Sequence, residues 1–307
     1  MILGEGVNQR LNLLRIDPIP RNDLSEMKEP KTGDLHVNGV RIRYQDWGGS
    51  GAPIIVLHAT GFLGRIYASY ARAFTKIGRV FSYDQRGHGD SGLSPDGEYN
   101  WARTMDDLEA FLIAMGLNGV CAFGHSAGAT AIGSLAAKRP DLIERAVLSE
   151  PVIFESPTAP ELGWRNPFIE RTLKRKRSFA SVDAMFANFE KKPPYHTWRR
   201  DILRDYCEYG TRPTPHGSRE LKCTPEVEAR FYETSRDFDG LGEILRADIP
   251  MLILFGEKSD SLASTLADKV AARRRKGRVI NVPDTGHFMP MEIPDALASM
   301  AVEFFQK

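Results

Sequence analysis

Cysteine is scarce in this chain of 307 residues: only Cys121, Cys207 and Cys223 are present, and no two of them are spaced as C-x-x-C. An odd number without such a pair argues against a disulfide framework and against a structural zinc site. The same scarcity is typical of proteins from a reducing compartment. We therefore expect a cytoplasmic protein that binds no metal ion.

Long apolar runs are also missing. The longest, at 53–57 and 249–255, are far shorter than the roughly 18 residues that cross a bilayer. The first residues include Glu5, and no apolar segment with a small-residue cleavage site follows them. The sequence thus predicts neither membrane insertion nor a secretory signal peptide.

Neither positive nor negative charge dominates: the chain has 41 Lys and Arg residues and 40 Asp and Glu residues, for a formal net charge of +1. Such a balance carries no signal for nucleic acid or for a membrane surface. The hydrophobic fraction of 42% argues against disorder. We expect the partner to be a small-molecule substrate, and the composition leaves the oligomeric state open.

Apolar strands alternate with helical segments in two parts of the chain. The expected strands lie at 54–57, 80–83, 120–123, 146–149, 251–255 and 279–282. The expected helices lie at about 67–77, 104–115, 127–138, 262–274 and 294–305. This rhythm is typical of βαβ units, and it predicts an α/β fold with a mostly parallel central sheet flanked by helices. Ahead of it, Asn38-Gly39 between alternating residues predicts a β-hairpin.

The alternation stops between about 156 and 245. This stretch holds Pro193-Pro194 and many aromatic residues, and it has no comparable apolar strand. We predict a discontinuous catalytic core at 1–155 and 246–307 and an inserted helical cap at 156–245. Five basic residues lie between 171 and 177 and predict a solvated helix face, because charge runs are usually exposed to water.

Residues 124–128 read Gly-His-Ser-Ala-Gly, which matches G-x-S-x-G between an apolar strand and a helix of small residues. This is the setting of a nucleophile elbow, in which a tight turn exposes a serine at the carboxyl end of a strand. The pattern therefore predicts Ser126 as a catalytic nucleophile.

A serine nucleophile needs a base, and the base needs a carboxylate. His287 follows the last expected strand, which is the place for the base when the chain order is serine, acid, histidine. Asp260, after the strand at 251–255, is the predicted acid. Glu257 and Glu150 remain alternatives, because both also follow strands at the carboxyl edge of the sheet.

The oxyanion formed in acyl transfer needs backbone N–H donors. Ala127 follows the nucleophile and supplies the first. The loop after the strand at 54–57 should supply the second, which we assign to Thr60, with Phe62 as the alternative. His58 in the same loop is expected to be structural.

The chain at these residues resembles the serine-nucleophile branch of the α/β-hydrolase fold superfamily. The matching segments are 58–62, 84–91, 124–128, 256–260 and 286–287. Two departures stand out: the usual His-Gly of the oxyanion loop is His58-Ala59, and the acid loop is one residue longer than Gly-x-x-Asp. The resemblance implies the fold and the catalytic machinery, and it gives no cue to the substrate.

Ser126 also excludes some relatives, since dehalogenases and epoxide hydrolases of this fold use aspartate at the elbow. We expect a serine hydrolase that cleaves a carboxylic ester, lactone or thioester of a small, largely apolar substrate through an acyl-enzyme, without any cofactor. Carbon–carbon bond hydrolysis of a diketone, cofactor-free perhydrolysis and a non-catalytic ligand receptor are the alternatives.

Overall fold

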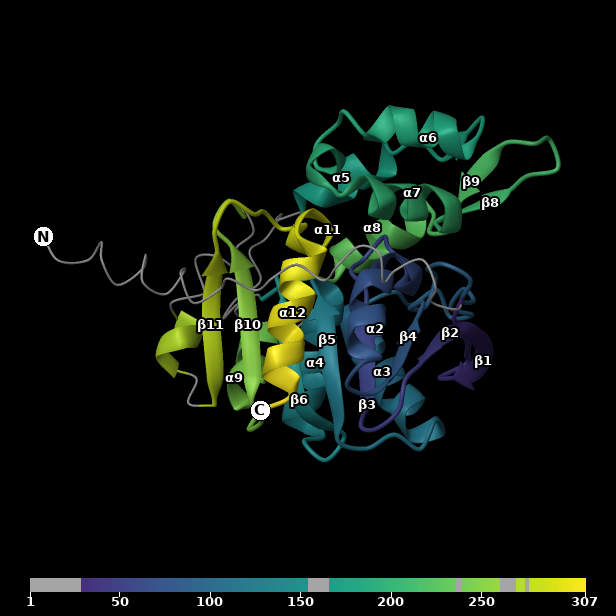
Figure 1. Cartoon of the computed structure of the whole chain (residues 1–307). Coiled ribbons are helices and arrows are strands. Elements are labelled where there is room, and N and C mark those ends of the chain that lie inside the picture. The colour runs from purple at the N-terminus through teal and green to yellow at the C-terminus, as the bar shows by residue number, and fades with distance from the viewer. Residues whose placement is uncertain (1–28, 154–165, 236–238, 260–268, 274–275) are drawn as a thin grey trace, which may run out of the picture.

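The computed structural model describes residues 29–153, 166–235, 239–259, 269–273 and 276–307. Within these residues, the largest element is a sheet of eight strands in the order β1-β2-β4-β3-β5-β6-β10-β11 (Figure 1). The strands are β1 (Lys31–Val37), β2 (Val40–Gly48), β3 (Pro53–Leu57), β4 (Arg79–Tyr83), β5 (Val120–His125), β6 (Ile143–Ser149), β10 (Met251–Gly256) and β11 (Gly277–Val282). From β4 to β11 all neighbours pair in parallel, which confirms the mostly parallel sheet.

The predicted hairpin is present at the antiparallel edge, where Val37 pairs with Val40. Asn38 and Gly39, the two residues of its turn, both have positive φ angles, of 48° and 76°. A turn of this kind matches the twist of the two strands, and Asn-Gly is the pair that tolerates it best.

Helices cover both faces of the sheet. Helices α2 (Ala68–Phe74) and α12 (Pro294–Phe305) pack together, with the rings of Phe74 and Phe305 5.4 Å apart. Helices α3 (Trp101–Ala114), α4 (Ala127–Lys138) and α9 (Gly240–Arg246) bury a second apolar core on the other face. The central strands β3, β5 and β10 are almost wholly buried, which is why they appear as continuous apolar runs.

The predicted elements of the core are confirmed, with small shifts at their ends. Helix α12 has the predicted bounds, whereas the helix expected at 67–77 is divided into a 3₁₀ turn, η3 (Gly64–Tyr67), and the shorter α2. The helix expected at 262–274 lies largely outside the described residues.

Apart from α9, which packs on the face of the sheet, the segment between β6 and β10 forms a separate layer over one end of the sheet (Figure 1). Its helices are α5 (Pro167–Leu173), α6 (Val182–Phe189), η4 (Tyr195–Thr197), α7 (Arg200–Tyr209) and α8 (Pro225–Glu233). It also contains a small antiparallel sheet that the sequence did not predict, formed by β7 (Ser178–Phe179), β9 (Arg219–Leu221) and β8 (Thr211–Pro213). Strands of two or three residues are too short to show an alternating pattern.

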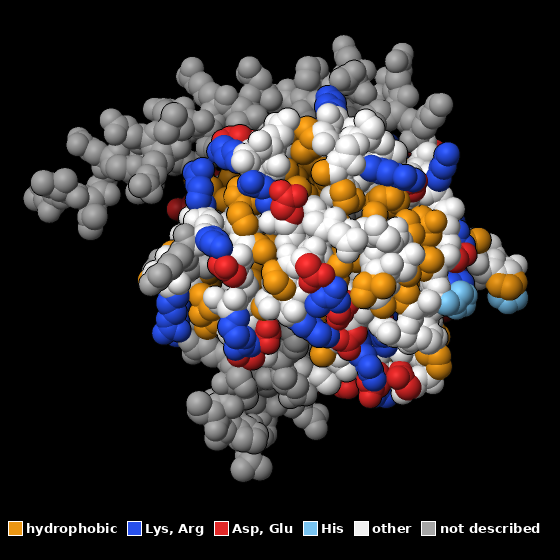
Figure 2. Space-filling model, turned by 90° about the horizontal axis from the view of Figure 1, so that it is seen from below, with side chains coloured by type: hydrophobic (Ala, Val, Ile, Leu, Met, Phe, Trp, Pro, Cys, Tyr) orange, Lys and Arg blue, Asp and Glu red, His pale blue; other side chains and the backbone are white. Residues whose placement is uncertain are grey.

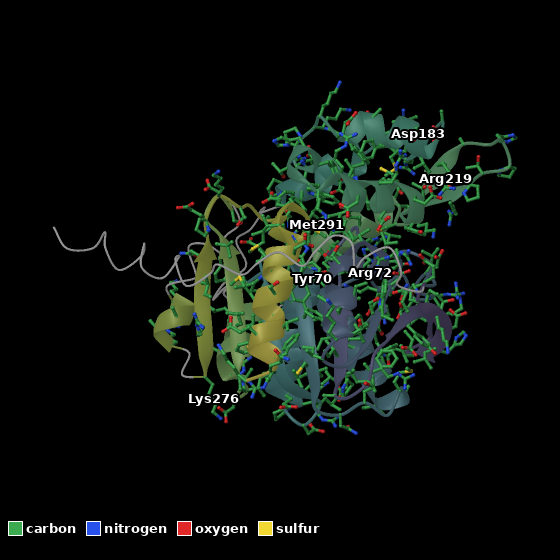
Figure 3. All side chains as sticks on the ribbon, viewed as in Figure 1. Tyr70, Arg72, Asp183, Arg219, Lys276 and Met291 are labelled. Carbon is green, nitrogen blue, oxygen red and sulfur yellow. The ribbon has the colours of Figure 1, made fainter. Side chains whose placement is uncertain are left out.

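The labelled side chains of Figure 3 place this layer relative to the rest of the molecule. In Figure 3, the labelled Asp183 and Arg219 lie in the layer and Lys276 lies at the opposite end of the sheet. Tyr70 and Met291 lie beneath the layer, where the Tyr70 hydroxyl donates to the carbonyl oxygen of Pro290 at 3.1 Å. Figure 2 shows the face at the far end of the sheet, where Lys and Arg are interspersed with Asp and Glu.

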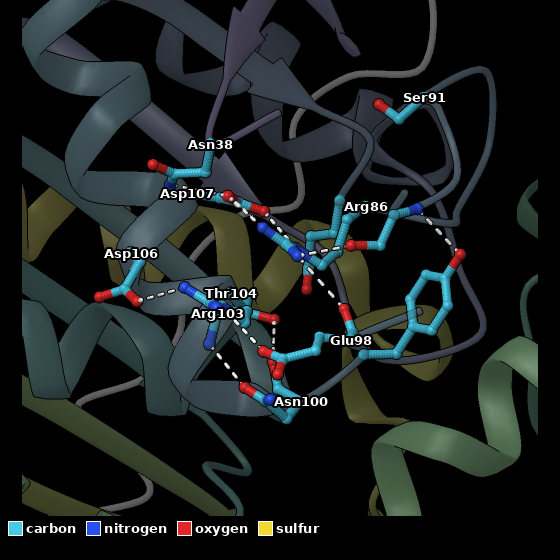
Figure 4. Close-up of polar contacts among 12 residues, drawn as sticks. Asn38, Arg86, Ser91, Glu98, Asn100, Arg103, Thr104, Asp106 and Asp107 are labelled. Carbon is cyan, nitrogen blue, oxygen red and sulfur yellow. Dashed lines mark hydrogen bonds and ion pairs between the residues drawn. The ribbon is translucent and has the colours of Figure 1, made fainter. Parts of the chain in front are cut away.

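A buried ion pair ties α3 to the loop after β4 (Figure 4). Arg86 donates to both carboxylate oxygens of Asp107, each at 2.7 Å, and to the Ser94 hydroxyl at 3.0 Å. The Asn38 side chain donates to the same carboxylate at 3.0 Å. Both charged side chains are at most 2% exposed, so each depends on the other for its stability in the core.

We expect Asp107→Ala to lower the free energy of unfolding by about 3–5 kcal/mol, because it leaves the Arg86 guanidinium buried without its carboxylate. Urea denaturation followed by circular dichroism measures the change. Asp106→Ala on the same helix is the matched control: Asp106 is 37% exposed, and its exposed ion pairs are each worth about 0–1 kcal/mol. Equal effects of the two substitutions would contradict a special role for the buried pair.

Candidate active site

Ser126 lies in the turn between β5 and α4 with φ and ψ angles of 54° and −121°, a conformation that L residues rarely adopt. The two flanking glycines make this turn sterically feasible. A Cβ atom on Gly124 would lie 2.7 Å from the backbone of Ala129, and one on Gly128 would lie 2.6 Å from the carbonyl oxygen of His58. The chain therefore has the geometry of a nucleophile elbow.

His287 lies between Ser126 and a carboxylate. Its Nε2 atom is 3.2 Å from Ser126 Oγ, and its Nδ1 atom is 2.9 Å from Glu150 Oε2. Because a carboxylate only accepts, Nδ1 carries the ring proton, and Nε2 is left to accept the proton of the serine hydroxyl. The structure thus brings Ser126 and His287 together as the sequence predicted.

Glu150 directly follows β6 and is fully buried, with a positive φ angle of 50°. Its carboxylate also accepts the backbone N–H of Gly256 at 2.6 Å and the hydroxyl of Ser259 at 2.7 Å. Burial by itself would raise the pKa of Glu150, but the hydrogen bonds from His287, Gly256 and Ser259 outweigh it and hold that pKa below its ordinary value. Glu150 is thereby kept ionised beside His287.

Of the other two candidate acids, Glu257 lies within the described residues. Asp260, the predicted acid, lies outside the described residues. Glu257 uses its carboxylate to accept the backbone N–H of Asp284 at 3.1 Å. Glu150, the remaining alternative, is thus the carboxylate that the described structure places on His287.

Two backbone N–H groups near Ser126 fit the predicted oxyanion donors. Ala127 is the first residue of α4, where N–H groups lack a partner within the helix. In the loop after β3, the N–H groups of Ala59, Gly61 and Phe62 donate to Tyr67 Oη, His88 Nε2 and the Ala59 carbonyl oxygen. No acceptor for the N–H of Thr60 is found among the described residues. Thr60, rather than Phe62, therefore retains a donor for a ligand.

Buried histidines brace the same loop. His58 Nε2 accepts the backbone N–H of Gln85 at 2.8 Å, and His58 Nδ1 lies 2.7 Å from the carbonyl oxygen of Ala59. His88 Nε2 accepts the N–H of Gly61 at 2.9 Å. Both nitrogens of His58 are occupied by backbone groups, which is the geometry of the structural residue that the sequence predicted.

These buried imidazoles give the fold a predicted pH dependence. Burial lowers the pKa of His88 to about 4 and that of His125 to about 3, from 6.5. As the pH falls below 6.5, the unfolded chain binds protons that the folded chain does not, so stability falls. Burial also holds the pKa of His58 well below 6.5, and it raises the pKa values of Asp84 and Asp205 to about 6, from 3.8. Between pH 6 and pH 4 the two carboxyl groups therefore oppose two of the three imidazoles, and the uptake of one proton on unfolding remains.

We therefore expect a net loss of about 1 kcal/mol in the free energy of unfolding per pH unit between pH 6 and pH 4. Urea denaturation at several pH values measures it. His88→Asn should flatten the slope, while His216→Asn, at an exposed position, should leave it unchanged. A slope of the opposite sign would contradict neutral imidazoles in the core.

Helix α8 of the inserted segment lies directly against the oxyanion loop. A Cβ atom on Gly61 would lie 2.9 Å from the carboxylate of Glu228. The ring of Phe231, one turn further along α8, is 5.2 Å from that of His88. Ala127 shares an apolar cluster with Val227 and Phe231. The inserted segment therefore packs on the site itself.

Arg175 corrects the expectation of a fully solvated basic run at 171–177. Its side chain is 19% exposed, forms an ion pair with the buried Glu228 and donates to the hydroxyl of Tyr206 at 2.7 Å. The remaining four basic residues of the run, Arg171, Lys174, Lys176 and Arg177, are exposed as predicted. Among the five, Arg175 is the one turned toward the buried layer beside the oxyanion loop.

Aromatic side chains from both parts of the chain meet near His287. Phe62 of the oxyanion loop lies 5.2 Å from Trp198 and 5.6 Å from Tyr206, measured between ring centroids. Phe288, next to His287, lies 5.8 Å from Trp198. These contacts join the inserted segment to the two loops that carry the candidate oxyanion donor, Thr60, and the candidate base, His287.

No cluster of His, Cys, Asp and Glu that could hold a metal ion is found in the part of the chain that the structure describes. In the same part, no helix combines the length and the apolar character needed to cross a bilayer. The eight-stranded sheet and the tight strand-to-helix turn at Ser126 together define the α/β-hydrolase class.

Comparison with known proteins gives the family. The model of the alpha/beta hydrolase family matches residues 54–300, and the chain belongs to this family. It is 26% identical over 272 residues to a bifunctional esterase/perhydrolase of Acinetobacter calcoaceticus, covering 82% of this chain and 91% of the relative. It is 23% identical over 274 residues to 2-(acetamidomethylene)succinate hydrolase of Mesorhizobium japonicum, covering 83% and 88%.

Solved structures show the same fold. The crystal structure of E-2-(acetamidomethylene)succinate hydrolase superposes with a TM-score of 0.77 at 20% identity, covering 91% of this chain and all of the other. The enol-lactonase from Burkholderia xenovorans superposes with a TM-score of 0.67 at 22% identity, covering 90% of this chain and all of the other. The family and these relatives make the protein a hydrolytic enzyme.

Proposed function

We propose that the protein is a serine hydrolase of ester-like bonds with Ser126 as nucleophile, His287 as base and Glu150 as the acid that orients the base. The observation that carries this proposal is the unbroken series of hydrogen bonds from Ser126 Oγ through both nitrogens of His287 to the buried Glu150 carboxylate. Such a series meets the geometric requirement of an activated serine.

The reaction follows from these roles. Ser126 Oγ attacks the substrate carbonyl carbon while its proton passes to His287 Nε2, and the N–H groups of Thr60 and Ala127 stabilise the oxyanion. Collapse of the tetrahedral intermediate breaks the bond to the leaving oxygen or sulfur, which takes the proton from His287. Water then gives a proton to His287, attacks the acyl carbon and releases the acid. Ser126 recovers its proton in the last step.

The substrate that fits these surroundings is a small, largely apolar ester, lactone or thioester. The aromatic residues Trp198 and Tyr206 pack on Phe62 and Phe288, which belong to the loops of Thr60 and His287, and such surroundings favour apolar groups. In this proposal residues 156–245 act as a cap over a core formed by 1–155 and 246–307, and the enzyme works in the cytoplasm without a cofactor.

Hydrolysis of p-nitrophenyl acetate, butyrate, octanoate and palmitate by the purified protein tests the proposal. We expect turnover that favours short acyl chains, together with labelling of Ser126 by a fluorophosphonate. Labelling of Ser126 without turnover would contradict hydrolysis of simple esters. It would favour hydrolysis of a carbon–carbon bond or of a more specialised ester. Neither labelling nor turnover would contradict the assignment as a serine hydrolase and favour a ligand receptor.

Perhydrolysis is a second candidate, favoured by the relative that is named a bifunctional esterase/perhydrolase. In that reaction hydrogen peroxide replaces water as the acceptor of the acyl group, and a peroxy acid leaves. Oxidation of bromide in the presence of acetate and peroxide measures it. We expect any such activity to vanish together with esterase activity in Ser126→Ala, since both use the same acyl-enzyme.

A further inference from the structure

His125, the residue before the nucleophile, is fully buried at the end of β5 and uses both of its ring nitrogens. Its Nδ1 atom is 2.7 Å from the hydroxyl oxygen of Tyr67. Its Nε2 atom is 2.9 Å from the backbone carbonyl oxygen of His287. A side chain that plays no part in the proposed proton transfer thus binds the backbone of the proposed base.

The chemistry of the partners fixes the direction of each hydrogen bond. A carbonyl oxygen only accepts, so His125 Nε2 carries the proton and donates it to His287. The second nitrogen of the neutral ring then accepts, which makes the Tyr67 hydroxyl the donor to Nδ1. The Tyr67 oxygen in turn accepts the backbone N–H of Ala59 at 3.3 Å. Burial keeps the ring neutral by lowering the pKa of His125.

These three hydrogen bonds run without a break from the oxyanion loop to the loop of the base. Ala59 is the residue before Thr60, whose N–H is the proposed second oxyanion donor. His287 is held at its own carbonyl group. Because Tyr67 is also fully buried, water cannot replace any member of the series without opening the core.

We propose that Tyr67 and His125 are positioning residues, which together hold the oxyanion loop and the backbone of His287 at fixed positions relative to Ser126. This inference rests on the proposed function. Neither side chain exchanges a proton with the substrate. They act through the placement of other groups, and a displacement of about 1 Å can cost on the order of 10²-fold in rate.

Three variants test the proposal. Tyr67→Phe removes one hydroxyl, His125→Leu removes both hydrogen bonds, and His125→Gln retains an amide N–H that can reach the carbonyl oxygen of His287. Rates are measured with p-nitrophenyl butyrate and divided by the concentration of sites labelled by a fluorophosphonate, so that unfolded protein does not count. Thermal unfolding of each variant is recorded alongside.

We expect Tyr67→Phe to lower kcat per labelled site by about 10-fold and His125→Leu by about 10²-fold, with KM changed less than about two-fold, because placement in the transition state is affected more than binding. His125→Gln should recover part of the loss. The double variant Tyr67→Phe/His125→Leu should be no slower than His125→Leu alone, because both substitutions interrupt one series.

The failures can be told apart. An active wild-type enzyme whose variants lose thermal stability but keep kcat per labelled site would overturn the positioning role and leave the proposed function intact. Additive losses in the double variant would also overturn it. A wild-type protein that neither labels nor turns over would refute the proposed function and the positioning role with it.

Discussion

Ser126→Ala is expected to lower kcat for ester hydrolysis by about 10³-fold or more, and His287→Ala by a similar factor. The first variant has no nucleophile, and the second has a hydroxyl that no base activates. Because the two residues act as one unit, the double variant should lose little more than either single variant. Steady-state kinetics with p-nitrophenyl butyrate measures all three.

Matched controls separate this result from general damage to the protein. Ser178→Ala and His216→Ala change the same residue types at exposed positions of the inserted segment, and both should leave kcat within about two-fold of wild type. Turnover by Ser126→Ala at more than a tenth of the wild-type rate would rule out the acyl-enzyme mechanism.

Glu150→Gln is expected to lower kcat by about 10²–10⁴-fold while the protein stays folded. The amide has nearly the same shape as the carboxylate, but it does not support the positive charge that forms on His287. Glu150→Asp keeps the charge and shortens the side chain by one methylene. Its kcat should therefore lie between that of Glu150→Gln and that of the wild-type enzyme. Fluorophosphonate labelling should slow in parallel, because the nucleophile becomes less reactive.

Asp260→Asn and Glu257→Gln are the controls for this prediction. If Glu150 is the acid, both should remain within about ten-fold of wild type, since the carboxylate of Glu257 binds the backbone of Asp284 instead. An inactive Asp260→Asn together with an active Glu150→Gln would assign the acid to Asp260.

The fold could be predicted from the sequence because its signals are local and repeated. Each buried strand of the parallel sheet is a short apolar run, and Asn38-Gly39 marks a turn that few other pairs allow. The elbow was predictable for the same reason, since Gly124 and Gly128 are required by contacts within a few residues or with the adjacent strand. The prediction of Ser126 as nucleophile came from this motif, and the prediction of His287 as base came from chain order.

The identity of the acid could not be derived in the same way. Strands β6 and β10 are neighbours in the sheet, and both end in a carboxylate-bearing loop. Which carboxylate reaches His287 depends on the φ angle of 50° at Glu150 and on donors supplied by Gly256 and Ser259 from the next strand. Such conditions arise from tertiary packing, and the sequence near Glu150 carries no sign of them except that it directly follows a strand.

The partial burial of Arg175 and the contact between Glu228 and Gly61 could not be predicted from the sequence either. A run of five basic residues within 171–177 has no periodicity that marks one of them as partly buried. The partner of Arg175 lies 53 residues further along the chain, on α8. Pairing over that distance is set by how the helices of the inserted segment pack, which a pattern along the sequence does not describe.

The pairing of β5 with β6 bears on which parts of this enzyme can change during evolution. His125 and Ser149 are directly paired in the ladder of β5 and β6, so Ser126 and Glu150 are the residues that follow two paired neighbours. The proposed nucleophile and the proposed acid are therefore set side by side before the inserted segment begins, and the proposed base, His287, follows that segment on the loop after β11. Insertions, deletions and exchanges within the layer over the sheet can reshape the surroundings of the site while these three groups keep their spacing. The layer is thus carried between two parts of the chain that hold the proposed catalytic groups, which allows it to evolve without rebuilding them.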